Sequence, residues 1–375
     1  MRIVHIVGNR PQFIKLAPVS RTVQRRGHEE IIIHTGQHYD ENMSDIFFKE
    51  LEIPRPTKNL EIGSGSHAEM TASAMVGIEK ELIKIRPDAV ILYGDTDSTV
   101  AGAMATSKLN IPICHVEAGT RTFSRTNPEE KNRIVTDHLS DILCAADKES
   151  YNNLVKEGLE SRAILTGDVM YDSFLTYGDK DSEKILNKYG IEDNEYILMT
   201  WHRQENTTDI RRINLILSLV SKLNKKIILP LHPRTKSVLI KLGLWDTVLE
   251  ICNLKICEPV GYIENVTLMK HSQGILTDSG GLSKESYFAN RPCFFMVDLV
   301  VWPCLESINQ IIHLKLTDNE TILKEVKLMD DTMKHHASIR DDVTKKNEQV
   351  KEKINFFGDG HASELILDGI EGRLQ

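Results

Sequence analysis

Charged side chains stand directly after several apolar stretches of this sequence, where they can act as acids, bases or cations. The stretch 111–116 is apolar except for His115, and Glu117 and Gly119 follow it directly. We expect a buried strand that stops near Glu117. Because ligands bind beyond the carboxyl ends of strands in open α/β sheets, Glu117 is a candidate for acid/base chemistry.

The next residues predict a helix with Asn127 as its N-cap and Glu129 in its first turn. At a spacing of four residues, Arg133, Asp137 and Asp141 would share one face of this helix, with Glu129 one turn before Arg133. A stripe of solvated ion pairs would give the same pattern. The preceding strand end nevertheless makes Glu129 a second candidate acid or base.

Two other strand ends in the first half also carry charged residues. The β-branched run 3–8 leads through Arg10 into helical spacing, so helix N–H groups and a cation would suit an anion, although a plain strand–helix turn fits equally. The run 88–93 leads to Asp95, which would be unremarkable as an N-cap. Three successive strand ends bearing Arg10, Asp95 and Glu117 favour a shared site.

The second half of the chain repeats the alternation of strands and helices. His202 and Arg203 follow one apolar run and His232 follows another. A lone histidine is more often structural, but two His/Arg pairs favour an anionic ligand. In 278–281, Asp-Ser-Gly-Gly stands between a strand and a helix, so backbone amides can approach a diphosphate. Glu285, one turn on, suits ribose hydroxyls or is a solvated helix carboxylate.

Length and composition bound the class of protein. A chain of 375 residues with 41% apolar residues is long for one core, so we expect two domains. The net charge of -8 argues against general electrostatic binding of nucleic acid. Six cysteines without a CxxC pair indicate free thiols in a reducing compartment. No apolar run approaches a membrane span and no signal-peptide pattern opens the sequence, so we expect a cytoplasmic protein without membrane contact.

The order of elements predicts two doubly wound, Rossmann-like α/β domains that face each other across a cleft. We place the first domain at 1–170 and the second at 171–359. Such an arrangement is typical of proteins that bind a nucleotide-linked ligand. No metal-ligand spacing is evident, and we expect no metal site.

Nine ordered motifs then carry a family resemblance along nearly the whole chain. They are GNRPQFIK, TGQHYD, YGDTDST, HVEAGTR with NPEEKNR and DHLSD, WHRQENT, LHPRT, EPVGY, TDSGG and GDGHAS. Together they resemble the non-hydrolysing UDP-N-acetylglucosamine 2-epimerase family, whereas any one alone is weak. TGQHYDENMSDIFF, GDVMYD and SGGLSKE are especially similar to the branch of UDP-2,3-diacetamido-2,3-dideoxyglucuronate 2-epimerases.

The resemblance implies a GT-B-like fold whose C-terminal helix, about 360–375, returns to the first domain. It implies a homodimer that acts on a UDP-sugar without a cofactor. The reaction inverts C2: UDP is eliminated as the C2 proton is removed, and UDP adds back to the 2-acetamidoglycal as the proton returns on the opposite face. Such chemistry needs two acid/base groups and cations at the diphosphate.

Motif by motif, the resemblance assigns roles to individual residues. The acid/base or leaving-group roles fall to Asp95, Glu117, Glu129 and His202. Phosphate binding falls to Arg10, His202, Ser279, Gly280 and Gly281, and ribose binding to Glu285. The other candidates for substrate binding are Arg133, Arg203, His232 and Tyr262, the last on the uracil side. Which carboxylate takes which proton stays open.

Several residues depart from the family's pattern. Val297 stands where arginine is usual and Ser283 where glutamine is usual, and the acidic residues expected around Trp302 are replaced by Val300, Val301 and Cys304. These changes make one wall of the expected cleft more apolar. They leave open the sugar, and whether UDP is returned or lost to water.

Alternatives to a non-hydrolysing epimerase are a hydrolysing 2-epimerase that releases UDP, a GT-B glycosyltransferase, and a nucleotide-sugar-binding regulator. The carboxylates of the first domain argue against a transferase, which needs no base at C2 of its donor.

Overall fold

The computed structural model describes residues 1–36, 47–178, 180–300, 302–345 and 355–374, so most of TGQHYD, and Val301, lie outside the described residues. Two compact units make up the chain: unit 1 is Met1–Thr176 with Ile354–Gln375, and unit 2 is Tyr177–Lys353. The sequence places the crossing at 170/171, whereas the structure places it near the end of helix α7 (Val169–Tyr177). Contacts within unit 1 explain the difference, because Ser173 Oγ donates a hydrogen bond to the Ile14 carbonyl at 2.7 Å.

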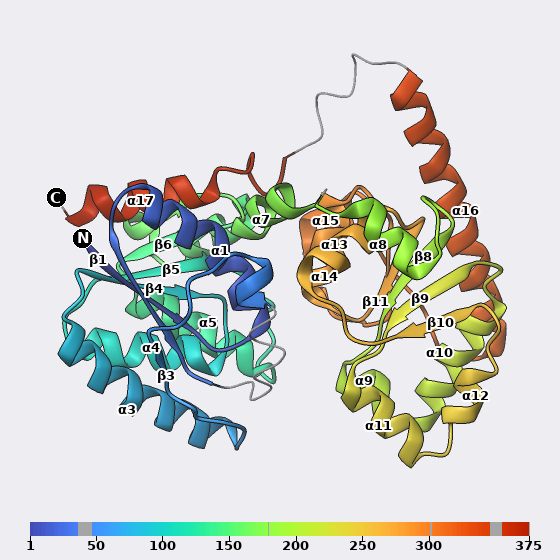
Figure 1. Cartoon of the computed structure of the whole chain (residues 1–375), viewed down its shortest axis with the longest axis horizontal. Helices are drawn as coiled ribbons and strands as arrows, with labels where there is room; N and C mark the ends of the chain where they lie inside the picture. Colours follow the sequence, from blue (N-terminus) through green and yellow to red (C-terminus); the bar gives the residue numbers. More distant parts are fainter. Residues whose placement is uncertain (37–46, 179, 301, 346–354, 375) are drawn as a thin grey trace. The chain divides into compact units, whose positions relative to one another are not determined.

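Unit 1 is built on a parallel sheet with the strand order β3-β2-β1-β4-β5-β6-β7. The strands are β1 (Arg2–Val7), β2 (Glu29–His34), β3 (Lys58–Asn59), β4 (Ala89–Tyr93), β5 (Ile113–Ala118), β6 (Ile142–Ala145) and β7 (Ala163–Leu165). Helices α1 (Arg10–Arg25) and α17 (Ala362–Leu374) lie on one face, and α3 (His67–Ile85) and α4 (Asp97–Lys108) lie on the other (Figure 1). Helices α5 (Pro128–Leu139) and α6 (Lys148–Lys156) connect the strands from β5 to β7.

Unit 2 has a second parallel sheet with the order β10-β9-β8-β11-β12-β13. Its strands are β8 (Tyr196–Thr200), β9 (Lys226–Pro230), β10 (Leu254–Cys257), β11 (Gly274–Thr277), β12 (Cys293–Phe295) and β13 (Ile311–His313). Its helices are α8 (Ser182–Tyr189), α9 (Gln204–Thr207), α10 (Ile210–Lys222), α11 (Pro233–Lys241), α12 (Trp245–Leu249), α13 (Tyr262–Lys270), α14 (Gly280–Phe288), α15 (Pro303–Ser307) and α16 (Asn319–Lys345). Helices α10 and α16 cover one face and α13 and α14 the other (Figure 1).

Each sheet reverses its strand order once, between β1 and β4 in unit 1 and between β8 and β11 in unit 2. The central strands read as continuous apolar runs because helices cover both faces; β4, for example, is buried at every position. The fold class predicted from the sequence, two doubly wound α/β domains, is confirmed. Ligands of such sheets bind at the reversal point beyond the carboxyl ends of the strands, which directs attention to the residues after β1, β4, β8 and β11.

The last helix packs on the first helix of unit 1. Arg26, at the end of α1, pairs with Glu364 at 2.7 Å and with Glu371 at 2.9 Å. The Asp172 carboxylate accepts hydrogen bonds from the first N–H groups of α17, at 3.1 Å from Ala362 and 2.8 Å from Ser363. The two Asp172 hydrogen bonds satisfy N–H groups at the start of α17 that have no partner within the helix. Among the helices described, none combines the length and the apolar character that crossing a membrane requires.

Candidate active site in the two units

Glu117 stands at a break in the regular pairing of its strand. The register between β5 and β6 shifts between Val116 and Ala118, and Glu117 has a left-handed backbone with φ of 69°. A bulge of this kind re-aims a side chain, and a non-glycine residue in this conformation is strained. The Glu117 carboxylate, 13% exposed, pairs with Lys15 Nζ of α1 at 2.8 Å. Lys15 is a site residue that the sequence analysis missed.

Arg133 of α5 forms ion pairs with two carboxylates of unit 1. Its Nη2 donates to Asp95 Oδ2 at 2.6 Å and its Nη1 to Glu130 Oε2 at 3.1 Å. Burial alone would lower the pKa of Arg133, but the charges of Asp95, Glu117 and Glu130 raise it. The guanidinium therefore stays charged among the three acids. Asp95 is not the N-cap of α4, because Thr96 takes that position.

Helix α5 begins as predicted and ends earlier than predicted. Asn127 is its N-cap and accepts a hydrogen bond from the Glu129 N–H at 3.1 Å, which confirms the predicted start. The helix ends before Asp141, so this residue does not share a face with Arg133, and its carboxylate binds the first N–H of β5 at 2.9 Å. Asp137 is fully buried. The predicted three-residue face, and its alternative as a solvated stripe, are therefore both wrong.

The acidic pair at the start of α5 divides into an exposed and a buried member. Glu129 is exposed, whereas Glu130 is 4% exposed and accepts hydrogen bonds from the N–H groups of Thr122 at 2.8 Å and Phe123 at 3.0 Å. Burial alone would raise the pKa of Glu130, but these hydrogen bonds and Arg133 lower it. Glu130 thus fixes the loop before α5, a role that no local sequence signal indicates.

Arg10 lies at the start of α1, with its side chain against an aromatic ring. The sequence places Arg10 in the turn before the helix, but it is the first residue of α1, and Asn9 is the N-cap in a reciprocal pair with Gln12. The Arg10 guanidinium stands 5.6 Å from the centre of the Phe47 ring. A cation at a helix N-terminus after β1 still suits an anion at the strand reversal.

Asp278 organises the corresponding end of the sheet in unit 2. This fully buried carboxylate accepts hydrogen bonds from the backbone N–H groups of His202 at 3.0 Å and Arg203 at 2.9 Å and from the Asn206 amide at 3.2 Å. It also lies 3.0 Å from His202 Nδ1. Burial alone would raise the pKa of Asp278, but His202 and the backbone donors lower it. The His202 side chain is 43% exposed, and its imidazole is held through Nδ1.

The Ser-Gly-Gly turn forms the N-terminus of α14, as the sequence predicts. Ser279 is the N-cap, and a Cβ added at Gly281 would meet only Ser279 Oγ, at 3.9 Å. The space beside Gly281 is therefore open to a ligand. Glu285 is 4% exposed, so its alternative as a solvated helix carboxylate is wrong.

The remaining sequence candidates of unit 2 lie on three other elements. His232 is the N-cap of α11, with Nδ1 accepting from the Arg234 N–H at 3.2 Å, which is a structural use of the side chain. Arg203 Nη1 lies 3.3 Å from Glu205. Tyr262 is the first residue of α13, and it is buried with its ring edge-on to that of Tyr177.

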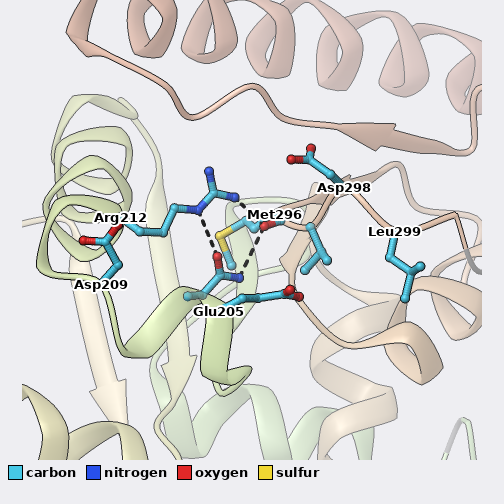
Figure 2. Close-up of a pocket in the computed structure, with 8 residues that line it drawn as sticks. Glu205, Asp209, Arg212, Met296, Asp298 and Leu299 are labelled. Atoms are coloured by element: carbon cyan, nitrogen blue, oxygen red, sulfur yellow. Dashed lines mark hydrogen bonds between the residues drawn. The ribbon is translucent and has the colours of Figure 1, made fainter. Parts of the chain in front are cut away.

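A cavity of about 370 Å³ lies beside the His202 turn and includes the altered wall (Figure 2). Arg212 crosses it and bonds Asn206 Oδ1 at 3.0 Å and the Met296 carbonyl at 2.6 Å. Because Asn206 also bonds Asp278, the cavity is connected to the turn that holds His202. Val297 is one of the residues that line this cavity.

Two other residues of the altered region contact the first turn of α14. Ser283 Oγ and Trp302 Nε1 both donate to the Gly280 carbonyl at 2.8 Å. Lys284, 1% exposed, places its ammonium 4.4 Å from the centre of the Trp302 ring. One departure from the family's pattern, Ser283, therefore lies at the turn that the sequence singles out for the diphosphate, and Trp302 beside the other departures contacts the same carbonyl.

Metal and disulfide chemistry have no counterpart in the part of the chain that the structure describes. No group of three His, Cys, Asp or Glu side chains in it is arranged to hold a metal ion. All six cysteines are free thiols, and Cys252 is exposed rather than buried.

The two doubly wound units, each with polar side chains at its strand reversal, define an α/β protein of GT-B-like architecture. The family model described as UDP-N-acetylglucosamine 2-epimerase matches residues 21–371. The chain belongs to this family.

Individual relatives agree with this assignment. The chain is 45% identical over 372 residues to a UDP-N-acetylglucosamine 2-epimerase homolog of Methanococcus maripaludis, covering 98% of this chain and 99% of that protein. It is 44% identical over 310 residues to the UDP-2,3-diacetamido-2,3-dideoxy-D-glucuronate 2-epimerase of Pseudomonas aeruginosa, covering 80% and 85%. Its fold is similar to that of Methanocaldococcus jannaschii UDP-GlcNAc 2-epimerase in complex with UDP-GlcNAc and UDP, with a TM-score of 0.86, 36% identity and coverage of 99% and 100%.

Proposed function

We propose that this protein inverts C2 of a UDP-N-acetylamino sugar, most simply UDP-N-acetylglucosamine to UDP-N-acetylmannosamine. The reaction eliminates UDP to a bound 2-acetamidoglycal and adds it back, with no redox cofactor. The observation that carries the proposal is that unit 1 holds two carboxylates in place with cations, Asp95 with Arg133 and Glu117 with Lys15. A glycosyltransferase of similar fold needs no such acid/base cluster.

In unit 1, the carboxylates supply proton transfer and the cations hold them in place. Asp95 is fixed by Arg133 at 2.6 Å and Glu117 by Lys15 at 2.8 Å. Asp95 follows β4 and Glu117 lies at the carboxyl end of β5, where parallel sheets present catalytic groups. Asp95 and Glu117 are our candidates for the two acid/base groups, with the exposed Glu129 as a third.

In unit 2, the groups that bind UDP are backbone amides and an oriented imidazole. Ser279, Gly280 and Gly281 open α14, where helix N–H groups and the helix dipole favour phosphate oxygens. The Asp278 carboxylate holds His202 Nδ1 at 3.0 Å, so Nε2 is the nitrogen that would donate to the departing diphosphate. The buried Glu285 is our candidate for the ribose hydroxyls.

A second substrate is favoured by a specific observation. The Pseudomonas aeruginosa relative, 44% identical, is named for UDP-2,3-diacetamido-2,3-dideoxy-D-glucuronate. Val297 lines the cavity beside Asn206, and Trp302 contacts the turn proposed for the diphosphate, so the residues around the departures are placed to affect which sugar is held.

Proton NMR of the UDP-sugar in deuterated water tests the reaction. A mixture of C2-deuterated UDP-sugars establishes non-hydrolysing epimerisation, whereas UDP with free N-acetylmannosamine establishes the hydrolysing reaction. Parallel incubations with UDP-N-acetylglucosamine and with the diacetamido uronate decide the substrate. If neither sugar exchanges its C2 proton, the proposed function is wrong.

Glu117→Gln is the matching variant. We expect it to retain UDP binding, because Glu117 is not among the groups proposed to bind UDP, and to lose C2 exchange. Normal exchange in this variant would remove Glu117 from the acid/base set.

We also infer a cytoplasmic homodimer. The outer helices of unit 1 expose apolar side chains, with Val76 at 47% and Ile83 at 54% on α3 and Met104 at 38% on α4. A second copy would cover such a face. Light scattering should give twice the chain mass, and Ile83→Glu should shift the protein toward the monomer.

A further inference from the structure

His115 is a fully buried imidazole whose two nitrogens both face acceptors. Nδ1 lies 2.6 Å from Asp137 Oδ1, and Nε2 lies 2.7 Å from the Gly94 carbonyl oxygen. A carbonyl oxygen only accepts, and a neutral imidazole has a single N–H. Nε2 must therefore carry a proton, and where the Asp137 carboxylate is ionised Nδ1 carries one as well, so the two contacts fit an imidazolium.

Asp137 is the carboxylate that balances this charge. Besides His115, it accepts hydrogen bonds from the Gly119 N–H at 3.1 Å and pairs with Arg121 Nη2 at 2.7 Å. Burial alone would raise the pKa of Asp137, but His115 and Arg121 lower it. Arg121 continues outward to Glu157, with Nε at 2.7 Å from its carboxylate. Every charge in the buried network therefore has an opposite neighbour.

The network joins the two strand ends that carry the candidate acid/base groups. The Gly94 carbonyl belongs to the residue directly before Asp95, and the Gly119 N–H lies two residues after Glu117. The His115–Asp137 pair thus fixes the chain on one side of each carboxylate.

We propose that His115 and Asp137 are positioning residues, a buried imidazolium–carboxylate pair that holds the backbone of the Asp95 and Glu117 turns in the geometry needed for C2 proton transfer. This inference rests on the proposed function, since it assigns Asp95 and Glu117 to the reacting centre. Neither His115 nor Asp137 is expected to touch the sugar.

Backbone strain next to the network supports a positioning role. Glu117 has φ of 69° and Gly119 φ of 82°. For a non-glycine residue such as Glu117 this conformation persists only where surrounding contacts enforce it, and the Asp137 carboxylate fixes the chain two residues later through the Gly119 N–H. Buried ion pairs are weak evidence for stability, because apolar residues of similar volume often serve as well. A network that fixes the chain beside the strained Glu117 is better explained by geometry than by stability.

Asp137→Asn is the decisive variant, because it keeps the shape and removes the charge. The amide oxygen can keep Gly119 and Arg121 only with its NH₂ group facing His115 Nδ1, which makes the imidazole neutral, so the charged pair that holds the two turns is lost. We expect kcat for C2 exchange to fall about 100-fold, the order expected for a small misplacement of reacting groups. KM and the affinity for UDP should change less than about twofold, since neither His115 nor Asp137 is among the groups proposed to bind UDP.

Glu157→Gln is the matched control. Glu157 is 27% exposed and contacts Arg121 but neither His115 nor the two turns in the described network. The substitution removes a negative charge from the outer end of the same network, so we expect the rate of C2 exchange to stay within about twofold of wild type. An equal loss in both variants would mean that any damage to the network suffices, and would overturn the specific role of the pair.

Histidine ¹⁵N NMR gives a readout that a purely structural role would not produce. In the wild type, one imidazole, identified by its loss in His115→Gln, should carry two slowly exchanging N–H protons. The signal should persist in Glu157→Gln and lose one proton in Asp137→Asn. A neutral His115 in the wild type would overturn the proposal, and this test stands even if Asp137→Asn fails to fold.

Failure of the proposed function is distinguishable from failure of this inference. Absence of C2 exchange in the wild type refutes the function and leaves the imidazolium signature to be measured. Exchange in the wild type together with undiminished exchange in Asp137→Asn refutes the positioning role alone.

Discussion

Gly119 is held where no other residue fits, and Gly119→Ala tests this directly. The backbone has φ of 82°, and an added Cβ would lie 2.2 Å from the Ser150 carbonyl oxygen and 2.8 Å from Leu154 Cγ. The nearest of these atoms, the Ser150 carbonyl oxygen, belongs to the backbone of α6, so either the loop that carries Gly119 or helix α6 must move. Because the Gly119 N–H binds Asp137, movement here also disturbs the turn that carries Glu117.

The chain offers a matched control in Gly158. Its φ of 77° is nearly the same as that of Gly119, but an added Cβ would meet nothing within 4 Å. A left-handed backbone costs an alanine about 1 to 2 kcal/mol. The steric overlap at Gly119 adds about 1 to 3 kcal/mol more. We therefore expect Gly158→Ala to lower the free energy of unfolding by about 1 to 2 kcal/mol and Gly119→Ala by about 2 to 5 kcal/mol.

Urea unfolding followed by circular dichroism gives the two free energies, and C2 exchange gives the activity of the same preparations. Gly158→Ala should retain the wild-type exchange rate, whereas folded Gly119→Ala should lose most of it. Equal destabilisation by the two substitutions would refute the close approach at Gly119. Full exchange in Gly119→Ala would refute the link between this turn and Glu117.

Three further outcomes are expected. Gly281→Val should abolish UDP binding in calorimetric titration while leaving the melting temperature nearly unchanged, because the structure leaves space for its side chain and only a ligand would meet it. Lys15→Met removes the cation 2.8 Å from Glu117, which costs about 3 kcal/mol for a largely buried pair, so C2 exchange should fall with UDP affinity retained. Asp278 has a pKa below its ordinary value of 3.8, so its charge stabilises the fold above that pH and the effect is lost as pH falls through the folded-state value. Urea unfolding should therefore show Asp278→Asn less stable than wild type at pH 7, with the difference shrinking below about pH 3.8.

Local signals in the sequence were sufficient for the starts of α5 and α14. Asn127 before a proline and two acids identifies a helix N-terminus, since each residue type suits its position there. The Ser-Gly-Gly turn at 279–281 is recognised in the same way. Parallel strands then bring their carboxyl ends to one edge, so the placement of Asp95 and Glu117 follows from the fold class.

Partners distant in sequence could not be found in this way. Lys15 and Glu117 meet only because α1 and β5 pack in one unit, and the one available signal was a lysine among apolar residues of a helix. The end of α5 was missed because Ser140 adopts an extended backbone without glycine or proline to mark the stop. The sequence prediction continued the four-residue spacing past Ser140 and therefore placed Asp141 on the helix, although α5 ends at Leu139.

The described departures from the family's pattern are confined to one unit, and this bears on what they change. Ser283, Val297, Val300 and Cys304 belong to unit 2, whereas the carboxylates proposed for proton transfer belong to unit 1. Ser283 contacts the carbonyl of Gly280, at the turn proposed for the diphosphate. We expect substitutions there to act on how UDP and the adjoining sugar are held. The proton transfer proposed at C2 uses groups that these substitutions leave intact, so a change of sugar requires no change in that step.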